Sequence, residues 1–158
     1  MRGEKLPNWS RHPLISAPNK LLTTIEFDNY SFVRYKAMFA LRNIGDENAI
    51  KSLASGLNDS SALFRHEVAF VLGQVASPHA ASELTERLRD PEESPMVRHE
   101  CAEALGSIAS PGLGVEDELA RYLSKETPAV VRESCEIALD MADYNNSEEF
   151  QYANALTQ

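Results

Sequence analysis

Two His-Glu dipeptides stand at equivalent places in this sequence and supply the side chains best suited to metal chemistry. They are His66-Glu67 and His99-Glu100. Two imidazoles with two carboxylates form a ligand set that suits iron, manganese or zinc. Carboxylate-rich ligation that leaves coordination positions open favours iron that activates oxygen. We therefore predict a metal site formed by His66, Glu67, His99 and Glu100.

Two other interpretations of these pairs stay open. A single His-Glu dipeptide on a helix is usually surface decoration. Duplication of the pair favours a function, because the flanking segments carry Tyr35-Lys36 and Glu133-Ser134 at the matching places. Two repeats that descend from one recent duplication would, however, also share the pair by ancestry.

The pairs lie in segments that repeat along the chain. The four segments that align are FVRYKAMFALRNIG, LFRHEVAFVLGQVA, MVRHECAEALGSIA and VVRESCEIALDMAD. Their arginines, Arg34, Arg65, Arg98 and Arg132, fall 31, 33 and 34 residues apart. A period of this length is typical of a helical solenoid. Because the arginines share one structural place, we expect them to form scaffold contacts such as salt bridges between repeats.

Helix punctuation indicates that each repeat is a pair of antiparallel helices. Residues that favour helix starts precede the four segments: Ser31, Ser61, Ser94 and Thr127. The intervening stretches 46–58, 78–89 and 115–125 are also amphipathic. We expect an all-α solenoid of about four helical hairpins, with almost no sheet, over residues 19–158. Residues 1–18 are predicted to be a linker or a flexible tail, and the final residues a short capping helix.

The helical period predicts where the histidines point. At about 100° per residue, His66 lies about 200° from Phe64 and faces away from the apolar stripe. The side that carries His66 also carries Ala69 and Gly73, whose small size predicts the floor of a groove. Close helix packing at Gly73 and Gly106 is the alternative. Equivalent helices of neighbouring repeats pack roughly 8 to 10 Å apart, so the matched side chains converge on one centre or line a shared cleft.

Charge and composition limit the partners. With 15 Lys and Arg against 24 Asp and Glu, a net charge of -9 argues against binding to nucleic acid or to an anionic membrane. A basic partner suits it better. Cys101 and Cys135 lie in helical segments, as reduced and buried thiols of cytoplasmic proteins do. The sequence shows no long apolar run and no apolar region of the signal-peptide type, so we expect neither secretion nor membrane insertion.

The repeats also carry a specific family resemblance. LFRHEVAFVLGQ and PMVRHECAEALGSIA, followed by VVRESCEIALDMAD and FQYA, closely resemble the C-terminal half of deoxyhypusine hydroxylase, from about Leu21 to the end. The resemblance implies a HEAT-repeat fold. It also implies a di-iron monooxygenase that uses O2 to hydroxylate deoxyhypusine on translation initiation factor 5A. By this resemblance His66, Glu67 and His99 match metal ligands, whereas Glu100 matches a glutamate that contacts the substrate.

The resemblance also implies a missing half. In that family two facing halves each supply two His-Glu pairs, and this chain has two pairs in all. The other ligands would come from a second copy in a homodimer or from a separate HEAT half; an inactive, incomplete product is a third reading. From another class of function, the alternative is a non-enzymatic HEAT scaffold that binds a basic protein partner. A lyase-type or chaperone-like HEAT module ranks after it.

Overall fold

The described part of the chain is built from helices. The computed structural model describes residues 31–110 and 112–147, and these contain no strand. One set of helices comprises α2 (Ser31–Ile44), α4 (Ala62–Val75), α6 (Pro95–Ile108) and α8 (Ala129–Asn146). The other comprises α3 (Glu47–Ala54), α5 (Ala81–Arg89) and α7 (Val115–Ala120), with the 3-10 turns η2 (Ser55–Asn58) and η3 (Pro78–Ala80). The predicted all-α class is confirmed, and the predicted tail and final capping helix lie outside the described residues.

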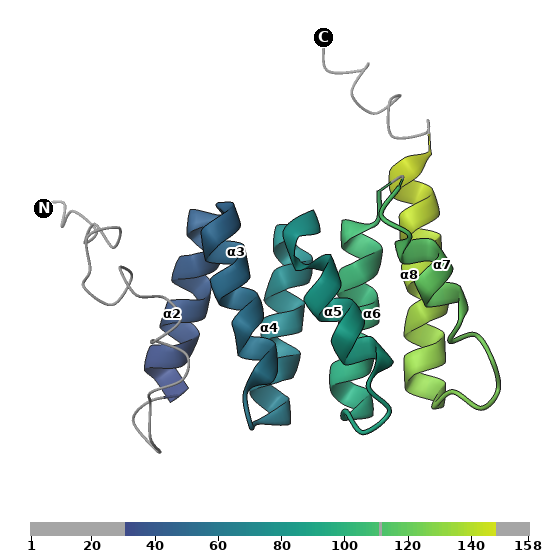
Figure 1. Ribbon diagram of the computed structural model, residues 1–158, viewed down its shortest axis with the longest axis horizontal. Helices are drawn as coiled ribbons and strands as arrows, with labels where there is room; N and C mark the ends of the chain where they lie inside the picture. Colours follow the sequence, from purple (N-terminus) through teal and green to yellow (C-terminus); the bar gives the residue numbers. More distant parts are fainter. Residues whose placement is uncertain (1–30, 111, 148–158) are drawn as a thin grey trace, which may run out of the picture.

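The helices form two layers, and the chain alternates between them. Figure 1 shows α2, α4, α6 and α8 side by side along the long axis, with α3, α5 and α7 as the second layer. Within the first layer α6 packs against α4 on one side and against α8 on the other. The core lies between the layers and includes the fully buried Met38, Leu53, Leu72, Leu84 and Leu105. Among the described residues, none of the helices has the length and apolar character needed to cross a membrane.

The structure confirms the predicted helix start at Ser61 and corrects the one at Thr127. Ser61 caps α4, because its hydroxyl accepts a hydrogen bond from the backbone N–H of Phe64 at 3.3 Å. Thr127 was predicted to cap the last helix, and this is wrong. Pro128 takes the cap position with φ -50° and ψ 134°, and its carbonyl accepts the first helical hydrogen bonds, so α8 begins at Ala129.

Three of the repeated arginines, Arg34, Arg65 and Arg98, make scaffold contacts as expected. Arg65 of α4 binds both carboxylate oxygens of Glu93, at 2.7 and 2.6 Å, and so ties α4 to the connection between α5 and α6. Arg98 is buried and donates to the carbonyl of Leu88 at 2.9 Å, which ties α6 to α5. Arg132 pairs instead with two acids of its own helix, Glu133 and Glu136, each at 3.9 Å.

The expected groove floor is wrong, because that side of each helix is a packing surface. A Cβ on Gly73 would lie 3.1 Å from the Cα of Ala104, and one on Gly106 would lie 2.7 Å from the Cα of Ala138. Ala69 is fully buried beside them. The small residues let successive helices approach each other closely, so the close-packing alternative is the correct one.

The two glycines should respond differently to alanine. Gly106→Ala should destabilise the fold by about 1–3 kcal/mol, because the added methyl overlaps backbone atoms of α8. Gly73→Ala should be nearly neutral, because its looser contact is offset by the helix propensity, about 1 kcal/mol, that alanine gains over glycine. Urea unfolding followed by circular dichroism measures both, and equal stabilities of the two variants would contradict this account of the packing.

Candidate metal centre

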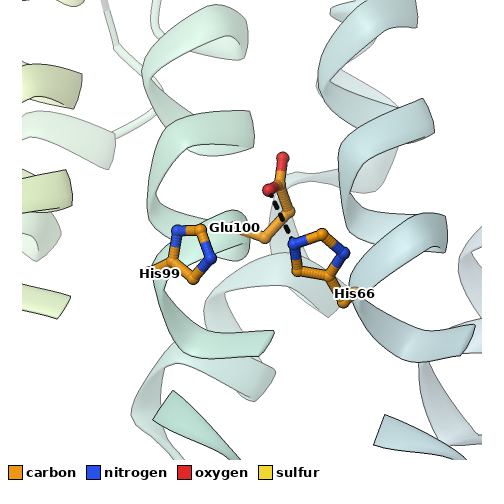
Figure 2. Close-up of side chains that lie close together, drawn as sticks. All are labelled: His66, His99 and Glu100. Atoms are coloured by element: carbon orange, nitrogen blue, oxygen red, sulfur yellow. Dashed lines mark ion pairs between the residues drawn. The ribbon is translucent and has the colours of Figure 1, made fainter. Parts of the chain in front are cut away.

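His66 and His99 meet in the gap between α4 and α6. They occupy equivalent places near the N-terminal ends of two helices that pack side by side. Their ring centroids are 5.5 Å apart with an interplanar angle of 47°. In Figure 2 one nitrogen of each ring points into the space between the helices. The two imidazoles thus converge as the repeat spacing predicted, while their role stays a prediction.

Glu100 completes a group of three potential ligands. It follows His99 on α6, and its Oε2 lies 3.2 Å from Nε2 of His66 on the neighbouring helix (Figure 2). Its side chain is only 10% exposed. Burial raises the pKa of Glu100, and the nearby His66 partly offsets this rise. A carboxylate in this position gains from any positive charge placed between the rings.

Glu67, the fourth predicted ligand, is not part of this group. Its Oε1 lies 3.5 Å from Nδ1 of His66, on the opposite side of the ring from Glu100, and its side chain is 32% exposed. The repeat explains why Glu67 lies outside the group. Glu100 of α6 faces the preceding helix α4, and Glu67 of α4 likewise faces the preceding helix α2. Tyr35 of α2 occupies the histidine place there, and its pKa is raised by burial and by the charge of Glu67.

A further side chain contacts the site and was not found from the sequence. Glu103 lies one turn after His99 on α6, with Oε1 3.5 Å from the Nδ1 of that histidine. The hydroxyl of Ser134 on α8 donates to the same Oε1 at 3.0 Å. The available signal was an acidic residue four positions after a histidine, a spacing that places two side chains on one helix face. The equivalent residue after His66 is Phe70.

The three side chains have the chemistry and nearly the spacing of a metal site. One ligand atom from each of His66, His99 and Glu100 lies within 4.8 Å of the others. Ligands bound at about 2.0–2.2 Å to one ion lie at most about 4.4 Å apart, so small side-chain rotations would close the group around an ion. Two imidazole nitrogens and one carboxylate oxygen are also the protein ligands of non-haem iron oxygenases, which keep further positions open. The residues therefore fit a transition-metal ion.

Comparison with known sequences assigns the fold. The sequence pattern that describes HEAT repeats matches residues 18–95 and 51–140. The chain belongs to the HEAT-repeat family. The predicted HEAT-type solenoid is thereby confirmed.

Within this family the chain is similar to deoxyhypusine hydroxylases. That of Lentinula edodes is 57% identical over 127 residues, which are 79% of this chain and 38% of that protein. That of Drosophila melanogaster is 54% identical over 129 residues, 80% of this chain and 41% of that protein. The structure of human deoxyhypusine hydroxylase in complex with glycerol matches with a TM-score of 0.74 and 47% identity, over 82% of this chain and 43% of that chain. The sequence resemblance is confirmed, and this HEAT chain spans about two-fifths of the length of its relatives.

Removal of a ligand should weaken metal binding. We expect His66→Ala and His99→Ala each to reduce the affinity for Fe(II) or Co(II) at least about tenfold, since loss of an outer-shell partner alone costs about 10–100-fold. His79→Ala is the matched control, because His79 is exposed on η3 and lies outside the group. Anaerobic titration calorimetry gives the affinities, and an equal loss in His79→Ala would show that binding occurs elsewhere.

The two glutamates should also differ. Glu100→Gln should weaken binding more than Glu67→Gln, because only the first removes a carboxylate from the group of three. Burial raises the pKa of Glu100, so protons should compete with the ion above the usual glutamate range and the affinity should fall as the pH is lowered through that range. Equal effects of the two substitutions in the same titration would contradict the assignment.

Proposed function

We propose that this HEAT chain forms half of a deoxyhypusine hydroxylase. The whole enzyme would use iron and O2 to hydroxylate the deoxyhypusine side chain of translation initiation factor 5A. The observation that carries the proposal is the convergence of His66, His99 and Glu100 between two consecutive repeats. The chain is also 53–57% identical to proteins named for that activity.

We exchange the roles that the family resemblance implied for Glu67 and Glu100. His66 and His99 would hold the iron together with Glu100, the buried carboxylate already in contact with His66. Glu67 lies outside the group and is partly exposed, so it is available to bind an amine of the substrate. The bound iron would supply the activation of O2. The protein residues would hold the ion, fix the substrate amines and keep water from the target carbon.

The charge of the chain supports a polycationic substrate. Deoxyhypusine is a lysine extended by an aminobutyl arm, so it carries more than one positive charge at neutral pH. A chain with a net charge of -9 would attract such a group and disfavour nucleic acid. We place the protein in the cytoplasm, because its two cysteines, Cys101 and Cys135, are free and buried.

We propose that a second HEAT half completes the site and that a second copy of this chain supplies it. One chain brings three candidate ligands together in the described residues, and its relatives are about twice as long. Four exposed apolar side chains lie one helical turn from His66, from His99 or from Glu133, the residue at the equivalent position of α8. They are Leu63, Phe70, Met96 and Ile137. A two-fold axis over this face would cover them and bring two such groups together, since a two-fold interface uses the same patch on both subunits.

Mass, metal content and product test the proposal together. After anaerobic loading, we expect a dimer with about one iron per chain, because each chain supplies one group of three ligands. With reductant and O2 it should add one oxygen atom to deoxyhypusine in factor 5A, seen by mass spectrometry, and His99→Ala should abolish the addition. A strict monomer that binds no iron would contradict both the homodimer and the activity.

Binding of factor 5A by histidine variants of this chain distinguishes a non-enzymatic scaffold from an enzyme. The acidic charge alone would suffice to bind a basic segment, so a scaffold should keep its affinity for factor 5A in the double variant His66→Ala, His99→Ala. The enzyme reading predicts that wild-type protein loaded with iron modifies the factor. Retained binding without modification would favour the scaffold.

A further inference from the structure

We propose that Glu103 is a positioning residue for His99 and that Ser134 of the next repeat holds Glu103 in place. This inference rests on the proposed metal centre for its purpose. It concerns a contact that the two His-Glu motifs do not include, because Glu103 lies beyond the motif on α6 and Ser134 lies on α8.

The contact selects which nitrogen of His99 is free. Nδ1 of His99 lies 3.5 Å from a carboxylate oxygen of Glu103. A carboxylate beside Nδ1 favours the tautomer that carries its proton there, and this leaves the lone pair on Nε2. Figure 2 shows one nitrogen of His99 directed toward His66 and Glu100. Since Nδ1 lies beside Glu103, Nε2 is the nitrogen that faces the candidate centre.

Ser134 explains how a partly exposed carboxylate keeps this position. The side chain of Glu103 is 40% exposed, and a free glutamate would lose rotamer entropy on being held in one geometry. Ser134 is buried between α6 and α8, and its hydroxyl donates to the same oxygen that faces His99. This serine occupies the place of Glu67 and Glu100 in its own repeat, so α8 supports the centre without supplying a ligand.

The Nδ1 atoms of the two histidines face different carboxylates. Phe70 stands where Glu103 stands in the next repeat and offers no acceptor to His66. Nδ1 of His66 instead lies 3.5 Å from Oε1 of Glu67, which the removal of Glu103 leaves in place. Loss of Glu103 should therefore disturb His99 and leave His66 unchanged, which provides an internal reference.

The experiment compares tautomers and metal affinity in the full chain. Long-range proton-nitrogen NMR of the metal-free protein at mildly alkaline pH should show the proton of His99 on Nδ1 in the wild type and a mixture of tautomers in Glu103→Ala. The affinity for Zn(II) should fall about 10–100-fold in Glu103→Ala and by less in Ser134→Ala. Glu103→Gln should keep most of the affinity, because its amide oxygen still accepts from Nδ1.

The controls separate positioning from charge and folding. Glu86→Ala removes an exposed acid of α5 outside the site and should change neither measurement. Thermal unfolding should show that the Glu103 variants are folded. An unchanged His99 tautomer together with unchanged zinc affinity in Glu103→Ala would overturn the proposal. If the wild type binds no metal, the proposed function fails, whereas the NMR comparison still decides whether Glu103 orients His99.

Discussion

The close approach of neighbouring helices within the first layer is the constraint on which the site depends. Gly73 lies against Ala104, and two turns earlier on the same helix pair the rings of His66 and His99 come within 5.5 Å. A bulky residue in place of the glycine would separate the helices, and the two imidazoles would then be too far apart to bind one ion. Gly106 brings α8 against α6 in the same way, and Ser134 thereby reaches Glu103. Close packing at the two glycines therefore positions both the candidate ligands and the side chains that we propose to support them.

Burial of Glu100 has an electrostatic cost that the site would recover when it binds a cation. A carboxylate removed from water is stable only if it takes up a proton, a hydrogen-bond donor or a positive charge. The raised pKa of Glu100 records this cost, and His66 offsets part of it. A divalent ion between the rings would offset more. The scaffold arginines meet the same requirement differently, since Arg65 neutralises the nearly inaccessible Glu93 with two hydrogen bonds.

The repeat period was enough to predict the solenoid and the meeting of the two histidines. It did not show which neighbour each glutamate faces, because a helical wheel gives an angle on one helix and not the direction in which the next repeat lies. Glu67 and Glu100 have the same angle, yet Glu100 reaches a histidine and Glu67 faces the helix of Tyr35. The prediction of a groove floor was wrong for a related reason. Small residues on a helix are compatible with open space and with close packing, and only the position of the neighbouring helix decides between them.

The order of the repeats also determines how many groups of candidate ligands the two His-Glu pairs form. Each group takes one imidazole from a repeat and an imidazole with a carboxylate from the next repeat, so two consecutive His-Glu repeats make one group and leave the first glutamate over. Tyr35 in the preceding repeat and Glu133 in the following one do not extend the pattern, and in the described part of the chain one group of three ligands is present. A centre with two ions therefore requires a second array of the same kind, and in a two-fold arrangement the glutamate left over in each array would be available to hold the substrate.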